Sequence, residues 1–163
     1  MRTVFRPDVE RLEVLTLLSN LAPHLMPRVP QTVTVASPLL VTLTTDQSTY
    51  TVGQPVHLTL TVTNRSQQTV TFIDGPAVDG FLVSQNGAIV WRSNAGLQPQ
   101  FLRLVTLRPG QSYTLHATWD GHPNTSAGTE LPGQSPTGLF NVTSQFHALG
   151  AVVPAATFTI QTV

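Results

Sequence analysis

The sequence predicts an all-β protein, an immunoglobulin-like antiparallel β-sandwich with a short N-terminal helix. The spacing of apolar residues changes from the helical to the strand period across the proline-rich stretch "PHLMPRVPQ". The chain also holds 13 Pro and 11 Gly, as is typical of short strands joined by tight turns. We therefore divide it into an N-terminal helix with its linker, residues 1–38, and a sandwich domain, residues 39–163. A closed barrel is the alternative architecture.

Residues 8–22 are predicted to form the helix. Pro7 precedes them and suits the start of a helix, and acidic residues at positions 8, 10 and 13 favour the positive end of its dipole. Pro23 ends the helix. One apolar stripe follows at helical spacing: Val14, Leu15, Leu18, Leu21 and Leu25. We expect the stripe to pack on the sandwich or to mediate self-association with another copy. A removable propeptide is the alternative.

From Leu39 onward, apolar and hydroxyl side chains alternate. In "VHLTLTVT", Val56, Leu58, Leu60 and Val62 fall on one face and threonines dominate the other, which predicts antiparallel sheet with one buried face. "QSYTLHATW" repeats the pattern, with Tyr113, Leu115, Ala117 and Trp119 predicted inward. Strands are expected near 39–45, 56–64, 69–74, 79–85, 88–92, 101–107, 111–119, 138–148 and 155–162.

The expected connections are of two kinds. "NRSQQ", "QNGA" and "RPGQ" have the chemistry of hairpins and β-turns, and Asn86-Gly87 is the strongest of these signals. Residues 92–100 and 120–138 lack such signals, and the second stretch is the longest without regular structure. Loops of that length inside a compact domain are usually functional or disordered.

Composition excludes several classes of function. Charged residues make up 10% of the chain and the net charge is zero, with 8 scattered arginines and no lysine. Nucleic acid and anionic membranes both need clustered positive charge, so neither is an expected partner. No stretch is long and apolar enough to span a membrane. A cytoplasmic location is the default, although the absence of cysteine fits an exported chain equally.

The sequence offers little ionised chemistry. No histidine spacing indicates zinc, and no G-x-S-x-G elbow marks a nucleophile, so we expect neither an enzyme nor a cofactor or metal. Asp120, His122 and Glu130 share one loop and give a weak cation alternative. His57 and His116 lie on outward strand faces, where pairing across strands is the alternative to independent surface positions.

An ordered set of motifs resembles the intracellular proteinase inhibitor family, BsuPI. It runs through "YTVGQPVHLTLTVTN", "GAIVWRS", "LRPGQSYTLHATWD" and "LFNVTSQFHA". The matching residues are Tyr50, Gly53, Val56, Asn64, Ser66, Gly87, Trp91, Arg92, Pro109, Gly110, Trp119, Phe140 and Val142. The chain departs from the family pattern at "VDGFLV", where Gly80 is inserted, and at "PTGLF". The resemblance implies inhibition of an intracellular serine protease by loops of an immunoglobulin-like scaffold.

The resemblance names no inhibitory residue, so candidates come from the long loops. Leu131, followed by Pro132, suits an extended inhibitory loop because proline after the pocket residue makes a poor scissile bond; Leu97 is the second candidate. Leu131 anchoring its own loop is the plainer reading. Trp91, Arg92 and Trp119 are expected to be structural, with Arg92 stacking there or binding Asp79 or Asp120. A non-enzymatic interaction module without inhibitory activity is the alternative function.

Overall fold

The computed structural model describes residues 37–75, 79–99, 101–131 and 136–162. The predicted helix at 8–22 lies outside the described residues, as does Pro132. The described part is all-β and contains no helix, so it holds none with the length and hydropathy of a membrane span. Its strands are β1 (Leu39–Thr45), β2 (Thr49–Thr51), β3 (Val56–Asn64), β4 (Val70–Asp74), β5 (Phe81–Gln85), β6 (Ala88–Arg92), β7 (Arg103–Leu107), β8 (Ser112–Trp119), β9 (Gly138–Ser144) and β10 (Ala156–Gln161).

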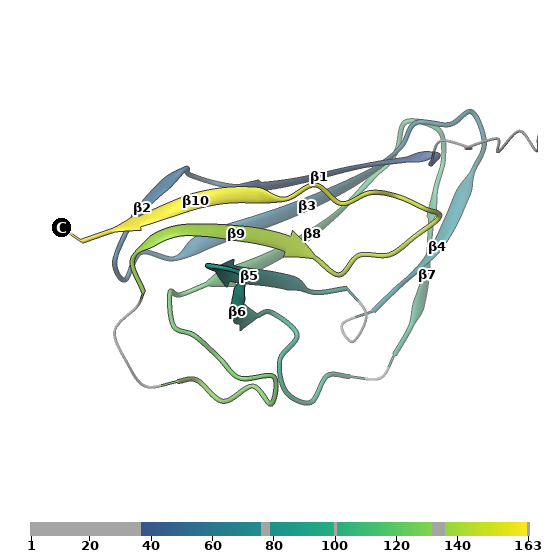
Figure 1. Ribbon diagram of the computed structural model, residues 1–163. Coiled ribbons are helices and arrows are strands. Elements are labelled where there is room, and N and C mark those ends of the chain that lie inside the picture. Colours follow the sequence, from purple (N-terminus) through teal and green to yellow (C-terminus); the bar gives the residue numbers. More distant parts are fainter. Residues whose placement is uncertain (1–36, 76–78, 100, 132–135, 163) are drawn as a thin grey trace, which may run out of the picture. The chain divides into compact units, whose positions relative to one another are not determined.

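The strands form three sheets (Figure 1). One sheet has the order β1-β3-β8, a second has the order β2-β10-β9-β5-β6, and β4 and β7 make a two-stranded ribbon. All neighbouring pairs are antiparallel except β2 and β10, which run parallel. The expectation of a wholly antiparallel sandwich is therefore wrong at this pair. The short strand β2 was also missed, because three residues are too few to show an alternating pattern.

The core lies between the two larger sheets. Val56, Leu58, Leu60 and Val62 are fully buried, as their alternation with threonine and histidine predicts. Aromatic contacts join the sheets: the Trp119 ring of β8 meets Phe140 of β9 at 5.3 Å and Phe158 of β10 at 6.0 Å. Such contacts add to the stabilisation from buried area.

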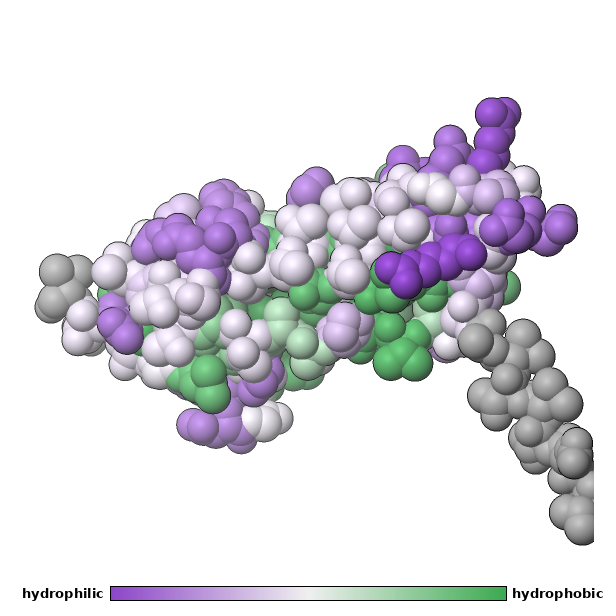
Figure 2. Space-filling view, turned by 90° about the horizontal axis from the view of Figure 1, so that it is seen from above, coloured by the Kyte–Doolittle hydropathy of each residue, from purple (hydrophilic) through white to green (hydrophobic). Residues whose placement is uncertain are grey.

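The outward faces carry the threonines. Along β3, the positions between the buried residues are half-buried or exposed. The face seen in Figure 2 has pale and hydrophobic residues along its middle and strongly polar colour towards its ends. Threonine hydroxyls pair across strands, as between Thr71 and Thr106 at 3.1 Å and between Thr63 and Ser112 at 2.8 Å. Threonine thus supplies a wet sheet face with few charges.

Asn64 joins the end of β3 to two other segments. Its side chain is fully buried and donates to the carbonyls of Gln68 at 2.7 Å and Leu107 at 2.9 Å. Its Oδ1 accepts from the backbone N–H and the hydroxyl of Ser66. The amide therefore holds the turn after β3 against β7, which explains an asparagine at a position that is otherwise apolar in pattern.

The predicted inward face of β8 is covered over only part of its length. Trp119 is fully buried, whereas Tyr113, Leu115 and Ala117 are half-buried. The reason is topological, because β8 is an edge strand of its sheet and β6 is an edge strand of the facing sheet. Side chains at this open side of the domain have core neighbours on one flank and solvent on the other.

Candidate functional site

The described part of the long loop, residues 120–131, is an ordered hairpin. Asn124 and Glu130 form a β-bridge, the Leu131 N–H donates to the carbonyl of Pro123 at 2.9 Å, and the Thr125 N–H donates to the carbonyl of Thr129 at 2.9 Å. The expectation that this stretch lacks regular structure is wrong for these residues. The bridge could not be predicted because prolines and glycines interrupt the alternating pattern on which strand prediction depends.

Asn124 attaches this hairpin to the edge of β6. Its N–H donates to the carbonyl of Val90, its Oδ1 accepts from the Arg92 N–H, and its Nδ2 donates to the Arg92 carbonyl, each at 2.9 Å. The asparagine thus occupies the position of a neighbouring strand and satisfies the outer edge of β6. This role was not predicted, since a lone asparagine in a polar loop carries no sequence signal.

A glycine pair fastens the two candidate loops together. The Gly96 N–H donates to the carbonyl of Ser126 at 3.1 Å, and a Cβ at Gly128 would lie 3.0 Å from the Gly96 Cα. Both glycines also have positive φ angles, 78° and 85°. Only glycine fits such a close backbone approach in that conformation. Gly128 therefore fixes one loop on the other.

The two candidate leucines differ in exposure. Leu97 follows Gly96 and is fully exposed, and Leu131 at the end of the hairpin is 46% exposed. Both loops therefore present an apolar side chain to solvent from a backbone that is held by hydrogen bonds. A side chain on a backbone that is already constrained loses less conformational entropy on binding than one on a free loop.

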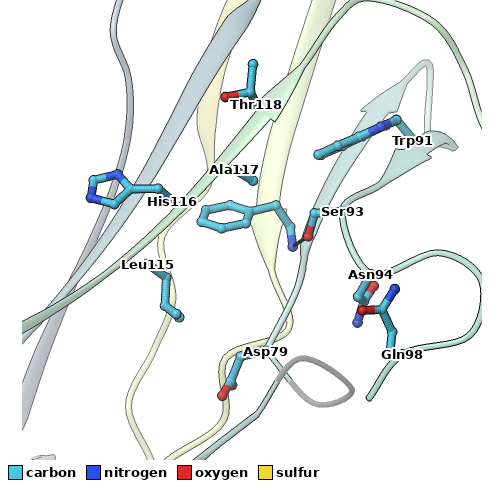
Figure 3. A pocket seen from close by; sticks show the side chains of 10 residues that line it. Asp79, Trp91, Ser93, Asn94, Gln98, Leu115, His116, Ala117 and Thr118 are labelled. Carbon is cyan, nitrogen blue, oxygen red and sulfur yellow. Dashed lines mark hydrogen bonds between the residues drawn. The ribbon is translucent and has the colours of Figure 1, made fainter.

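Two adjoining cavities lie along β8, at the open side of the domain. The first has a volume of about 310 Å³ and is lined by four apolar or aromatic residues, Phe81, Trp91, Leu115 and Ala117. Its polar lining residues are Asp79, Ser93, Asn94, Gln98, His116 and Thr118. Figure 3 shows Trp91 and Ala117 on opposite sides of this space, with the His116 ring pointing away from it. The second, of about 260 Å³, is lined by Asp74, Gly75, Asp79, Phe101, Arg103 and Leu115.

A group of polar side chains lies where the two cavities meet. Asp74 is buried, and its Oδ2 accepts from Arg103 and, at 2.9 Å, from the Tyr113 hydroxyl. Arg103 also donates to the Tyr113 oxygen. Asp79 binds Asp74 through its carboxyl group and accepts from the Gly75 N–H at 3.2 Å. The sequence did not predict this cluster, because its members come from β4, β7, β8 and the segment before β5.

The pKa values of the two carboxyl groups are shifted in opposite directions. Burial and the hydrogen bond to Asp74 raise the pKa of Asp79 to about 6. Burial also acts to raise the pKa of Asp74, but hydrogen bonds from Arg103 and Tyr113 outweigh it and hold that pKa below its usual value. Above pH 6 the cluster therefore gains one negative charge, at the wall shared by the two cavities.

The first cavity holds no catalytic triad. Its lining includes a serine, a histidine and an aspartate, but the Ser93 Oγ accepts from the Phe81 N–H and the His116 Nδ1 pairs with Thr59 on the neighbouring strand. His57 likewise pairs with Thr118, so the two histidines do not pair with each other. Asp120 and His122 lie 3.3 Å apart, and the described residues include no metal-binding group of three.

The residues that carry the family motifs occupy turns and buried positions. Tyr50 is buried, donates to Asp46 at 2.6 Å and accepts from the Gln47 N–H; burial and the Asp46 bond raise its pKa to about 12. Gly53, Gly87 and Gly110 stand in turns with positive φ angles. Pro109 precedes the last of these, in the turn between β7 and β8.

The two tryptophans lie beside each other, with ring centroids 6.3 Å apart. Trp119 donates its indole N–H to the carbonyl of His122, whereas Trp91 is half-buried and lines the first cavity. The ion pairs of the described part join Arg103 to Asp74 and His122 to Asp120, so the expected ion pair of Arg92 is not among them.

Comparison with solved structures gives distant matches. A β-glucosidase of Erythrobacter marinus is 10% identical with a TM-score of 0.46, covering 77% of this chain and 16% of its own. A β-glucosidase of Listeria innocua in complex with isofagomine is 12% identical with a TM-score of 0.45, covering 76% and 16%. The DNA glycosylase AlkC of Pseudomonas fluorescens is 9% identical with a TM-score of 0.41, covering 78% and 31%. The chain thus spans less than a third of the length of each.

Comparison with sequences is more specific. No curated protein matches the chain. The family described as intracellular proteinase inhibitor, BsuPI, matches residues 43–148, which covers β2 to β9 and the end of β1. The description suggests proteinase inhibition and a role other than catalysis. On this match, the chain belongs to the BsuPI family of intracellular proteinase inhibitors.

Proposed function

We propose that this protein inhibits an intracellular serine protease, with the loops at 93–99 and 120–138 as the contact surface. The sandwich domain, residues 39–163, acts as an immunoglobulin-like scaffold for these loops, and residues 1–38 form a separate segment whose apolar stripe mediates self-association. The family description supports the proteinase as the partner and the cell interior as the location. Leu131 enters the protease pocket, and Leu97 makes an adjacent contact. Pro132 slows cleavage of the peptide bond that joins it to Leu131.

The joining of the two loops carries this proposal. An inhibitor that binds like a substrate gains affinity when its loop is held in the bound conformation before binding, because less conformational entropy is lost. The Gly96–Ser126 hydrogen bond and the close approach of Gly96 and Gly128 supply such a constraint. Leu97 and Leu131 are both available to solvent on the constrained backbone.

Three leucine-to-aspartate variants test the proposal. We expect Leu131→Asp to abolish inhibition of subtilisin-like or trypsin-like proteases, because a charge is not accommodated in an apolar pocket. Leu97→Asp is expected to weaken inhibition. Leu139→Asp is the matched control, since Leu139 is 60% exposed on β9 and belongs to neither loop. The thermal transition of all three is expected to stay unchanged.

The outcomes separate three readings. Full inhibition by both loop variants refutes the loops as the contact surface. Loss of the thermal transition in Leu131→Asp assigns that leucine to anchoring its own hairpin. A wild-type protein that inhibits no protease in the panel supports the alternative, an interaction module without inhibitory activity.

A further inference from the structure

The outer edge of β8 offers unpaired backbone groups. Two hydrogen bonds show which way the backbone of β3 faces. The Asp46 N–H donates to the carbonyl of His57, so the backbone groups of His57 point towards β1. The Asn64 N–H donates to the carbonyl of Gln111, so the backbone groups of Asn64 point to the opposite side, towards β8. The backbone N–H and C=O groups of successive residues point to opposite sides of a strand. Tyr113, Leu115 and Ala117 therefore bond to β3, and the N–H and carbonyl groups of Thr114, His116 and Thr118 point outward.

These outward groups have no bonded neighbour among the described residues. β8 ends its sheet in the order β1-β3-β8, and the side chains of Thr114, His116 and Thr118 are exposed. The facing edge strand, β6, is different, because Asn124 satisfies it. Of the two edge strands at the open side, β6 is thus hydrogen-bonded to another part of the chain, and β8 is available for an added strand.

The cavities lie where the side chains of an added strand would point. A strand beside β8 projects every second side chain towards the facing sheet. Phe81, Trp91, Leu115 and Ala117 supply apolar walls there, and the space of about 310 Å³ accommodates side chains of ordinary size. Trp91 is half-buried at this wall, in the manner of an aromatic anchor. The site therefore offers both backbone hydrogen bonds and pockets for alternate side chains.

The charge of the second cavity specifies the partner further. Arg103 is already bound to Asp74 and Tyr113. Asp79 lines both cavities and adds a negative charge above pH 6 that no cation of the described residues neutralises. A Lys or Arg side chain entering beside Phe101 would meet that carboxylate and lower its pKa.

We propose that β8 binds an extended segment of a partner protein as an added strand, with apolar residues at alternate positions and one Lys or Arg directed to Asp79. This site adjoins the loop at 93–99, since Ser93, Asn94 and Gln98 line the first cavity. It uses the edge of β8, whereas the proposed protease contact uses the exposed leucines of the two loops. Two copies of this chain pairing through β8 fit less well, because residues 112–119 contain no Lys or Arg to meet the carboxyl pair.

Amide hydrogen exchange provides the first test. In the unbound protein, the amides of Thr114, His116 and Thr118 are expected to exchange faster than those of Leu115 and Ala117. The probe is a short fluorescein-labelled peptide of alternating valine and threonine with a terminal arginine, made with the arginine at either end. Saturating peptide is expected to slow the three outward amides. A second peptide carries glutamate in place of arginine and is expected to bind about tenfold more weakly.

Two variants of His116 separate the backbone from the side chain. His116→Pro removes an outward N–H without removing a bond to β3, and His116→Ala removes the same side chain but keeps that N–H. We expect the proline variant to weaken peptide binding about tenfold, by fluorescence anisotropy, and the alanine variant to bind like wild type. Asp79→Asn is expected to abolish the preference for arginine over glutamate.

Each result bears on the proposal. Slowed outward amides, together with an arginine preference that Asp79→Asn removes, support it. Outward amides that stay fast at saturating peptide overturn it, even if His116→Pro fails to fold. Sedimentation that shows a dimer, with the same amides protected without peptide, also overturns it by assigning the edge to a second copy. Protease inhibition is measured in parallel, and its absence refutes the loop proposal alone.

Discussion

Replacing Asn64 by alanine tests how far one buried amide holds the domain together. The wild-type side chain is fully buried and makes four hydrogen bonds, to Gln68, Leu107 and twice to Ser66. The Ser66 hydroxyl also reaches the Gln68 carbonyl at 3.0 Å, so that carbonyl keeps a partner. The Leu107 carbonyl and the Ser66 N–H lose theirs. An unsatisfied group costs about 1–3 kcal/mol when it is buried, as at the Leu107 carbonyl, and less when it is partly exposed, as at the Ser66 N–H, so we expect a total loss of about 2–4 kcal/mol.

Urea unfolding and thermal melting measure this loss. A domain of this size loses about 3–5 °C in melting temperature per kcal/mol, so we expect a fall of about 6–20 °C. Thr63→Ala is the control on the same strand, because its hydroxyl is exposed and makes a single bond to Ser112; its cost should stay below about 1 kcal/mol. A loss below about 1 kcal/mol for Asn64→Ala would refute the reasoning, since the turn would then hold without the amide.

Three further predictions follow from burial, charge and close contact. Trp119→Ala should destabilise by about 3–5 kcal/mol and Trp91→Ala by about half of that, measured by urea unfolding, because the first ring is fully buried and the second is half-buried; equal losses would contradict this. Asp79 has a raised pKa, so its contribution to folding is complete below pH 4 and is lost as the pH rises through about 6. Asp79→Asn cannot lose that proton, so its stability relative to wild type should rise between pH 4 and pH 8; a difference that is constant with pH would refute the assignment. Gly75→Ala should lower the melting temperature, because a Cβ there would lie 2.6 Å from the backbone oxygen of Phe101. An unchanged melting temperature would show that the backbone at Phe101 moves away without cost.

Alternation of side chains predicted most of the strands, and the reason is visible in β3. Apart from Asn64 at its end, its buried residues are all Val or Leu, and the residues between them are Thr or His, so one register alone buries the apolar face. The strands β1 and β6 begin and end where the pattern placed them. The strand β9 ends at Ser144, earlier than expected, because Phe146 and Ala148 beyond it are buried without being part of a strand. Burial and strand pairing are separate properties that one pattern cannot distinguish.

The candidate site was less predictable, because its geometry depends on contacts between distant residues. The attachment of Asn124 to β6 spans 32 residues, and no local pattern carries it. The carboxyl pair of Asp74 and Asp79 depends on two hydrogen bonds between Gly75 and Asp79, which no pattern of apolar residues predicts. What the sequence did indicate was that the long loops hold exposed leucines. Their joining through two glycines appears only in three dimensions.

The position of β10 has a consequence for how the chain folds. This last strand lies between β2 and β9, and its parallel partner β2 stands more than a hundred residues earlier. Loop-closure entropy opposes such pairings until other contacts form, so domains dominated by them fold in milliseconds to seconds. During synthesis, the five-stranded sheet stays incomplete until Phe158 and Ile160 emerge, and one edge of β9 remains unpaired until then. The window for aggregation is therefore set by the arrival of β10.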